Sequence, residues 1–298
     1  MAAITTDRLT KRFSSSTTAV DHVNITVEEG EVYGLLGRNG AGKSTLMGML
    51  LGLLKPTSGS FQIFGRSGSR ARMASDIGAL IESPAFYPFL SARRNLEVLA
   101  RYCGASARDV GVALERVGLD DVAGRRFSRF SLGMKQRLGI AIALLSKPDL
   151  MILDEPINGL DPIGIKEFRL MIQRLNQEKG ITILISSHIL SELYLVANRF
   201  GILDQGKIIR EISKAEFETL SEDYIVLKTA DKEKACQVLK EQIQLQFKVV
   251  NPENEIHIFG QEQDVKQILK ELTLADVAID EIYYARQNLE EYFTQLVE

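Results

Sequence analysis

The segment from Gly37 to Ser44 reads GRNGAGKS and directly follows an apolar stretch. It fits the pattern Gly-x-x-x-x-Gly-Lys-Ser/Thr. Because glycine has no β-carbon, backbone N–H groups in such a loop can turn toward phosphate oxygens, and the N-terminus of a following helix favours the anion. A glycine-rich turn that only caps a helix would not need the Lys-Ser pair. The sequence therefore predicts a nucleoside triphosphate site.

Within this loop, Lys43 is expected to reach the β- and γ-phosphates of ATP, and the Ser44 hydroxyl is expected to bind Mg²⁺. The residues predicted to surround the phosphates are Gly37, Arg38, Asn39, Gly40, Ala41, Gly42, Lys43, Ser44 and Thr45.

A second chemical signal lies at DLMILDEP, where four apolar residues precede Asp154 and Glu155. A buried strand would deliver both carboxylates to the carboxyl-terminal edge of a parallel sheet, where open α/β sheets bind ligands. Asp154 is predicted to hold Mg²⁺, and Glu155 to polarise the water that attacks the γ-phosphate. Two adjacent acids could instead form a solvated turn, but the phosphate loop upstream favours the catalytic interpretation.

Short apolar segments alternate with amphipathic ones before about Ser221, which predicts an α/β fold with a mostly parallel sheet. Glu31–Leu36 is predicted as a buried strand, and Lys43–Leu54 as a helix ended by Pro56. Ser91 and Ser106 are expected to be helix N-caps. The other predicted strands are Ser60–Phe64 in an antiparallel hairpin, Ile77–Ile81, Leu150–Leu153, Thr182–Ser186 and Phe200–Leu203. The other predicted helices are Ser91–Tyr102, Arg108–Val117, Leu132–Leu145, Ile163–Lys179 and Ser191–Ala197.

Three further segments indicate which family of nucleotide-binding proteins the chain resembles. FSLGMKQR resembles the signature LSGGQxQR of ABC ATPases, although Leu132 stands where that family usually has Gly and Met134 where it usually has Gln. INGLDP resembles the D-loop of the family, and ISSHIL resembles its switch-histidine segment. The matching signature positions are Ser131, Gly133, Gln136 and Arg137. The motifs follow the family's order and extend from residue 4 to about residue 215.

This resemblance implies an ABC ATPase domain of the phosphate-loop class, with an antiparallel N-terminal subdomain and a helical subdomain. It implies that Ser131 and Gly133 open a helix that closes over ATP held by a second copy, in a head-to-tail dimer. Asp161 of the D-loop is expected at the shared nucleotide site, and His188 is expected to contact the γ-phosphate. Phe13 stands at the position of the family's adenine-stacking aromatic, which is normally Tyr.

Glu82 is the most informative departure, because the family has Gln in this loop, which touches Mg²⁺ and the membrane partner. IESPAFYPFL resembles the subfamily that handles bacitracin and lantibiotic peptides. The resemblance implies that Glu82 is a metal ligand and that a transmembrane permease docks near Glu82–Leu90. Apolar residues gathered in a surface loop fit such a docking site.

The 298 residues carry a net charge of -3, but the charge is divided unevenly. Residues 221–298 hold 8 Lys or Arg against 16 Asp or Glu, a net charge of -8. An acidic tail argues against binding of nucleic acid. Cys103 and Cys236 match no metal spacing, and no apolar segment is long enough to span a membrane. We therefore expect a cytoplasmic protein that reaches the membrane only through its permease.

The sequence predicts two domains, 1–220 for ATP binding and 221–298 as an accessory α+β domain. The order of predicted elements in the tail, βαββαβ, is that of a ferredoxin-like sandwich. Its predicted strands are Tyr224–Lys228, Phe247–Val250, Glu255–Phe259 and Val277–Tyr283, and its predicted helices are Lys232–Gln242, Gln263–Leu272 and Leu289–Val297.

Three other functions remain open beside export or membrane extraction of a substrate such as an antimicrobial peptide. The chain could be the ATPase of a sensing or regulatory ABC complex. ABC ATPases of DNA repair carry long coiled coils, and no sustained heptads occur between the phosphate loop and the signature. Translation-associated ABC ATPases carry two cassettes, whereas this chain has one.

Overall fold

The computed structural model describes residues 1–14, 16–67, 77–81, 86–220, 224–250, 255–259 and 264–285. The chain divides into two compact units, one comprising Met1–Lys214 and the other beginning at Ala215. Each unit has its own hydrophobic core. The first unit contains every motif with a predicted chemical role.

A six-stranded sheet organises the first unit, with the strand order β11-β10-β4-β9-β8-β7. Its strands are β4 (Val32–Leu36), β7 (Ile77–Leu80), β8 (Leu150–Leu153), β9 (Thr182–Ser187), β10 (Arg199–Asp204) and β11 (Lys207–Ser213). All neighbours are parallel except β10 and β11. Every residue of β4, β8 and β9 is buried, as expected for strands covered on both faces.

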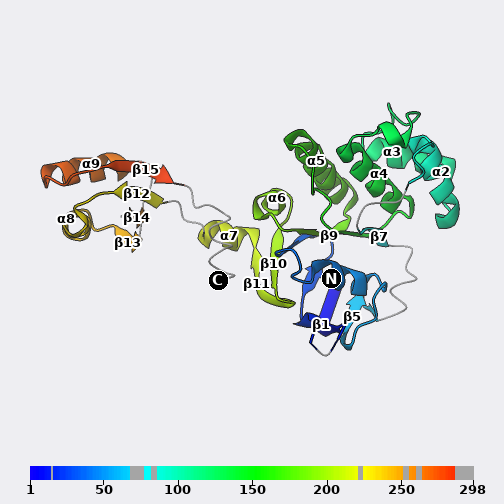
Figure 1. Ribbon diagram of the computed structural model, residues 1–298, viewed down its shortest axis with the longest axis horizontal. Helices are drawn as coiled ribbons and strands as arrows, with labels where there is room; N and C mark the ends of the chain where they lie inside the picture. The colour runs from blue at the N-terminus through cyan, green and yellow to red at the C-terminus, as the bar shows by residue number, and fades with distance from the viewer. Residues whose placement is uncertain are drawn as a thin grey trace. The chain divides into compact units, whose positions relative to one another are not determined.

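A second, antiparallel sheet has the order β2-β1-β5-β6, and β3 also pairs with β1. Its strands are β1 (Ala2–Arg12), β2 (Thr18–Val23), β3 (Thr26–Glu28), β5 (Ser58–Ile63) and β6 (Arg66–Ser67). Figure 1 shows β1 and β5 on one side of the parallel sheet and helices α2 to α5 on the other. The expected antiparallel and helical subdomains are both present.

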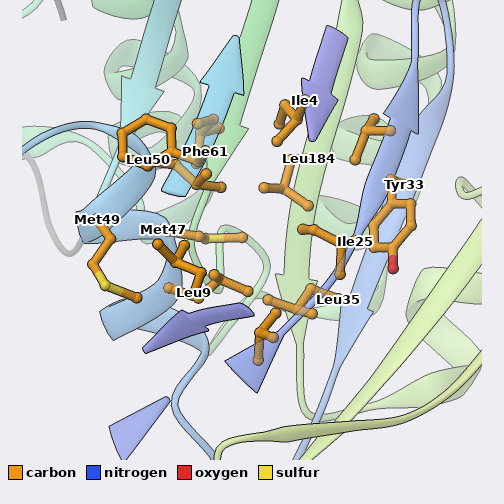
Figure 2. Packing of buried hydrophobic residues seen from close by; sticks show 14 of the residues in the cluster. Ile4, Leu9, Ile25, Tyr33, Leu35, Met47, Met49, Leu50, Phe61 and Leu184 are labelled. Carbon is orange, nitrogen blue, oxygen red and sulfur yellow. The ribbon is translucent and has the colours of Figure 1, made fainter. Parts of the chain in front are cut away.

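The main core lies between the two sheets and is closed by helix α1 (Lys43–Leu50). Figure 2 shows Met47 and Leu50 of α1 packed with Phe61 of the antiparallel sheet and Leu184 of the parallel one. Burial of one such side chain is worth about 1.5–3 kcal/mol. This packing holds the loop before α1 at the end of β4.

Helix α1 is shorter than predicted, because it ends at Leu50 rather than Leu54. Gly52 adopts a positive φ of 67°, its N–H donates to Met49 O at 2.9 Å, and Leu53 N–H donates to Gly48 O at 2.8 Å. This is a Schellman C-cap, in which a left-handed glycine stops the helix before Pro56 can act.

The other helices of the first unit are α2 (Ala92–Cys103), α3 (Ala107–Arg116), α4 (Leu132–Leu145), α5 (Pro162–Lys179) and α6 (Leu190–Tyr194). Ser91 and Ser106 are confirmed as N-caps of α2 and α3, and Ser106 forms a full capping box with Asp109. The sequence pattern did not predict strands β1, β6 and β11 or helix α7 (Lys214–Leu220).

The second unit contains a small antiparallel sheet with the order β13-β14-β12-β15. Its elements in chain order are β12 (Tyr224–Lys228), α8 (Lys232–Val238), a π-helical turn (Leu239–Ile243), β13 (Gln246–Val250), β14 (Glu255–Phe259), α9 (Asp264–Leu274) and β15 (Glu281–Ala285). Buried residues of both helices and of the sheet form its core. The predicted helix Leu289–Val297 lies outside the described residues.

The last strand begins later than predicted, at Glu281 instead of Val277. Val277 N–H donates to Leu272 O at the end of α9, and Ala278 N–H donates to Asp231 Oδ2 at 3.0 Å. These bonds hold the preceding residues in a connecting loop, so the apolar alternation that predicted a strand was misleading.

Candidate functional site

The phosphate loop connects the buried strand β4 to helix α1. A β-carbon at Gly37 would overlap the carbonyl oxygen of Leu203, and one at Gly42 would overlap that of Ala19. Gly42 also has a φ of 109°, a left-handed conformation that suits glycine. Gly40, with a φ of 83°, has no atom near the position of a β-carbon. The loop therefore combines tight backbone packing with an open side that a phosphate can approach.

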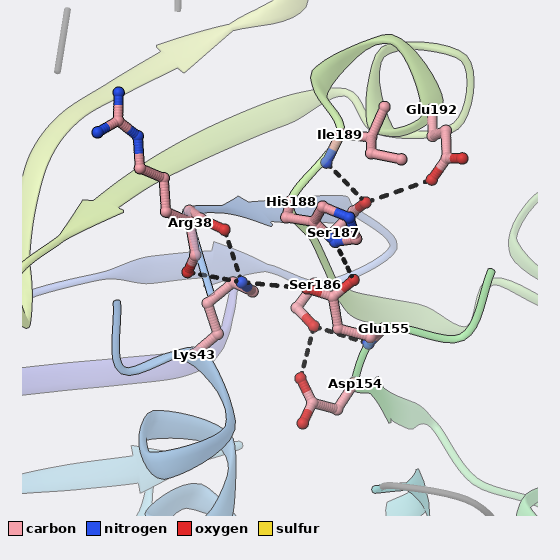
Figure 3. A network of polar contacts seen from close by, with 10 residues as sticks. Arg38, Lys43, Asp154, Glu155, Ser186, Ser187, His188, Ile189 and Glu192 are labelled. Atoms are coloured by element: carbon pink, nitrogen blue, oxygen red, sulfur yellow. Dashed lines mark hydrogen bonds and ion pairs between the residues drawn. The ribbon is translucent and has the colours of Figure 1, made fainter. Parts of the chain in front are cut away.

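Lys43 is the centre of the polar network in Figure 3. It is 5% exposed, and its Nζ donates to Gly37 O at 2.6 Å and to Arg38 O at 3.1 Å. The same Nζ lies 3.0 Å from Glu155 Oε1. The lysine charge is thus held over the loop and balanced by a carboxylate from another strand.

Asp154 and Glu155 follow strand β8, whose carboxyl end meets that of β4 across β9 at one sheet edge. Ser186 of β9 joins them: its Oγ donates to Asp154 Oδ1 at 2.6 Å and accepts from Glu155 N–H at 2.8 Å. Glu155 has a φ of 46°, which costs a non-glycine residue about 1–3 kcal/mol. The structure thus holds Glu155 in a strained conformation at the site.

Glu155 also contacts the switch histidine predicted from the sequence. His188 Nδ1 lies 2.9 Å from Glu155 Oε2, and because a carboxylate can only accept, the ring donates from Nδ1. Oε1 of Glu155 is buried, and its contact among the described residues is the Lys43 ammonium group, 3.0 Å away. Lys43, Glu155 and His188 therefore form one continuous cluster.

The signature and the D-loop interlock at the N-termini of α4 and α5. Ser131 caps α4 through Met134 N–H at 3.3 Å, and Asp161 caps α5 through Gly164 N–H at 2.7 Å. A β-carbon at Gly133 would lie 3.7 Å from Leu160 Cδ2, and one at Gly159 would lie 3.1 Å from Leu132 Cδ2. We call this reciprocal packing of Leu132 on Gly159 and of Leu160 on Gly133 the leucine-glycine clasp.

Phe13 lies on the hairpin between β1 and β2, where its N–H donates to Thr17 O at 3.0 Å. The ring is 56% exposed, with Lys11 Nζ 5.2 Å from its centroid. The carbonyl of Ala19, on the second strand of this hairpin, packs against Gly42 of the phosphate loop. The hairpin that carries this exposed ring therefore packs against the phosphate loop at Ala19.

Comparison with known proteins agrees with this geometry. The family described as ABC transporter matches residues 20–158. The chain is 41% identical to the bacitracin transport ATP-binding protein BcrA of Bacillus licheniformis, over 99% of this chain and 97% of that protein. The chain belongs to the ABC transporter ATP-binding family. It is the ATP-binding subunit of an ABC transporter, an ATPase that couples ATP hydrolysis to transport.

Two further matches extend the comparison. The lantibiotic transport ATP-binding protein SrtF of Streptococcus pyogenes is 48% identical over 71% of this chain and 92% of that protein. A solved dimeric ATP-binding cassette in a post-hydrolysis state, bound to ADP and phosphate, aligns with a TM-score of 0.64 and 25% identity. That alignment covers 71% of this chain and 98% of the solved one.

The structure brings together only some of the site residues predicted for this ABC subunit. Lys43, Asp154, Glu155 and His188 meet at the sheet edge, and Ser44 follows Lys43 in the first turn of α1. Among the described residues, no hydrogen bond or ion pair links Ser131, Gly133 or Asp161 to this cluster. Glu82 lies outside the described residues, so its predicted role stays a prediction.

Sequence reasoning missed three polar side chains at the site: Ser186, Ser187 and Glu192. Ser187 Oγ accepts from Ile189 N–H at 3.0 Å and donates to Glu192 Oε2 at 3.3 Å. Burial raises the pKa of Glu192, with hydrogen bonding from Ser187 and the charge of His188 opposing that rise. Two serines at the end of a buried strand, directly before His188, were the available signal.

The described part of the predicted docking loop exposes aromatic rings. Tyr87 is 51% exposed and Phe89 is 68% exposed. Buried Asn95 fixes this loop, because its Oδ1 accepts from Tyr87 N–H at 2.8 Å and its Nδ2 donates to Tyr87 O at 3.1 Å and Ser91 O at 3.0 Å. Among the described residues, every helix is too short or too polar to cross a lipid bilayer.

Proposed function

We propose that this ABC subunit hydrolyses ATP to drive export or membrane extraction of a peptide-antibiotic-class substrate through a separate permease. The observation that carries the substrate class is the 41% identity, over nearly the whole of both chains, to a protein named for bacitracin transport. The 48% identity to a lantibiotic transport protein supports the same class.

The Lys43–Glu155–His188 cluster would perform the hydrolysis. Lys43 would leave Glu155 for the β- and γ-phosphates, because the phosphates carry the larger negative charge. Glu155 would then be released to orient the attacking water through Oε1, the oxygen that the Lys43 ammonium group had contacted. His188 would stabilise the γ-phosphate, and Phe13 would stack on adenine, which is worth roughly 1–3 kcal/mol.

Oxygen donors at the site fit Mg²⁺. The Ser44 hydroxyl and the Asp154 carboxylate are hard ligands of the kind that Mg²⁺ prefers, and the expected third protein ligand is Glu82. No three acidic, imidazole or thiol groups converge into a self-sufficient metal site in the part of the chain that the structure describes. This fits a metal that keeps water and phosphate oxygens as ligands, and that would neutralise charge on the phosphates.

The residues left outside the cluster support a head-to-tail dimer. Ser131 and Gly133 open helix α4, whose N-terminus is suited to an anion, and they would close over the γ-phosphate held by a second copy. Asp161 would lie at the same shared site. The solved cassette that resembles this chain is itself dimeric.

The exposed rings of Tyr87 and Phe89 support docking of the permease at Glu82–Leu90. Anchoring of the loop by Asn95 would present these rings in one fixed arrangement. The subunit would then act at the cytoplasmic face of the membrane through this contact.

We further infer that residues 221–298 form a separate accessory domain with a ferredoxin-like topology. The chain order βαββαβ and the all-antiparallel order β13-β14-β12-β15 support that assignment. The net charge of -8 in this region disfavours nucleic acid as a partner.

Two variants separate nucleotide binding from hydrolysis. Lys43→Ala should lose tight MgATP binding because the phosphates lose their cation. Glu155→Gln should bind ATP but hydrolyse it at least about 100-fold more slowly, since the amide cannot act as a base, and it should accumulate as an ATP-bound dimer. Equilibrium nucleotide binding, phosphate release and gel filtration with ATP measure these effects.

The substrate class needs the subunit together with its permease. Co-expression should raise resistance of a sensitive host to bacitracin-like or lantibiotic peptides, and Glu155→Gln should abolish that resistance. Resistance unchanged across the whole peptide panel, with ATPase activity intact, would contradict the proposed substrate. A Glu155→Gln chain that stays monomeric with ATP, with or without permease, would contradict the dimer.

A further inference from the structure

The two serines that precede His188 face different partners. Ser186 holds Asp154 and the backbone of Glu155, whereas Ser187 turns away from them. The hydroxyl of Ser187 accepts from Ile189 N–H at 3.0 Å and donates to Glu192 Oε2 at 3.3 Å (Figure 3). His188 therefore lies in a turn whose two ends are tied by one hydroxyl.

Glu192 anchors this arrangement from helix α6. It lies in the first turn of a helix that begins at Leu190, and it is half-buried. Burial raises its pKa, the Ser187 hydroxyl and the charge of His188 lower it, and the charge of Glu155 adds to the rise. The carboxyl group thus interacts with both members of the His188–Glu155 pair, although it touches neither through a hydrogen bond that the structure describes.

A simpler interpretation treats Glu192 as an acid near a helix N-terminus. A helix of five residues has a small dipole, and a carboxylate that served only the dipole would remain solvated. The Glu192 carboxylate is instead partly shielded from solvent, and it accepts a hydrogen bond from Ser187 Oγ. The hydrogen bond from Ser187 Oγ to Glu192 favours a role at the histidine turn.

We propose that Glu192 is a positioning residue for ATP hydrolysis, which acts through Ser187 to hold the His188 imidazole against Glu155. This inference rests on the proposed roles of His188 and Glu155. With the turn fixed at both ends, His188 keeps one orientation toward Glu155 and the phosphate loop. Without Glu192, Ser187 can rotate, and the imidazole samples positions from which it no longer supports hydrolysis.

The test compares Glu192→Ala and Glu192→Gln in the full-length chain by steady-state MgATP hydrolysis. Loss of one positioning hydrogen bond should lower kcat about tenfold in Glu192→Ala while KM changes less than about twofold. Glu192→Gln should retain most of the activity, because its amide oxygen can accept from Ser187 Oγ. Glu178→Ala, an exposed acid near the end of α5, is the matched control and should behave as wild type.

A double-mutant cycle with Ser187→Ala tests the route of the effect. If Glu192 acts through Ser187, the double variant should be no slower than the slower single variant. Full activity of Glu192→Ala would overturn the proposal. Equal loss in a well-folded Glu192→Gln, or additive losses in the cycle, would also overturn it. Cooperative thermal melting shows whether each variant is folded. If Glu192→Ala does not fold, the activity of Glu192→Gln decides whether the proposal holds.

The failure of this inference and the failure of the proposed function are distinguishable. If Glu155→Gln and His188→Ala abolish hydrolysis while Glu192→Ala remains active, only the positioning role is wrong. If Glu155→Gln hydrolyses ATP at the normal rate, the proposed catalytic cluster is wrong, and the positioning role fails with it.

Discussion

At the scale of single residues, the site is a series of polar contacts in which the carboxylate of Glu155 neutralises the ammonium group of Lys43. Lys43 is held by two loop carbonyls and by Glu155, and Glu155 is held in turn by His188. This arrangement engages both carboxylate oxygens of the proposed base. Binding of ATP would replace one partner of Lys43 and so change the environment of Glu155, which couples binding to readiness for hydrolysis.

Ser186 is the residue on which this geometry depends most. Its hydroxyl is fully buried and serves both Asp154 and the strained backbone of Glu155. Ser186→Ala should destabilise the fold by about 1–3 kcal/mol because it leaves a buried acceptor and a donor unsatisfied. It should also lower kcat, since Glu155 loses its anchor.

Thermal melting and ATP hydrolysis measure both effects of Ser186→Ala. Ser146→Ala is a suitable control, because within the described part of the chain that hydroxyl bonds only to the carbonyl of Ala143 in α4. Wild-type stability and activity in Ser186→Ala would show that Glu155 is held by the turn alone.

At the scale of secondary-structure elements, the leucine-glycine clasp ties helix α4 to the D-loop before α5. Leu132 is one of the two departures from the usual family signature, and it packs over Gly159. A side chain at this position therefore couples the two segments that are proposed to reach the second copy's ATP.

Gly159→Ala should disturb the clasp. Gly159 has a φ of 77°, and a β-carbon there would lie 3.1 Å from Leu132 Cδ2. Gly180→Ala is the matched control, with a φ of 66° and no atom within 4 Å of a β-carbon. Both should lose about 1 kcal/mol of folding stability from backbone strain, and Gly159→Ala should lose more because Leu132 must move.

Urea unfolding of both glycine variants and ATP-dependent dimerisation in a Glu155→Gln background provide the measurement. Dimerisation should weaken only in Gly159→Ala. Identical behaviour of the two variants would show that Leu132 moves aside freely and that the leucine-glycine clasp does not affect dimerisation.

Local sequence patterns predicted the strands β8 and β12 and helix α4 with their observed bounds, because burial there follows a simple run or period. They failed where the ends depend on backbone geometry, as at Gly52, or on contacts from distant residues, as at Val277. The same limit applies to the site. Residue types identified Lys43, Glu155 and His188, whereas the roles of Ser186 and Glu192 depend on hydrogen bonds that only the folded chain brings together.

At the scale of the whole molecule, the two compact units have separate cores and different charge. The phosphate loop, the paired carboxylates and His188 all lie in the unit Met1–Lys214. Helix α7 follows it and buries Phe217. A fragment that ends at Leu220 keeps this helix whole, and it also corresponds to the predicted ATP-binding domain.

We expect the 1–220 fragment to bind ATP and to hydrolyse it at a basal rate comparable to the full chain, because every proposed phosphate-handling residue is retained. Separate cores should also give the full chain two calorimetric transitions, of which the fragment keeps one. Cooperative melting must establish folding first, since truncation can expose apolar surface. Lys43→Ala in the fragment is the control that assigns binding to the phosphate loop.

Loss of residues 221–298 should instead change the lifetime of the dimer or the stimulation of ATP hydrolysis by the permease. Removal of an accessory domain can affect either property while the residues that handle phosphate stay in place. A fragment that melts cooperatively but fails to bind ATP would show that the acidic tail contributes to the nucleotide site itself.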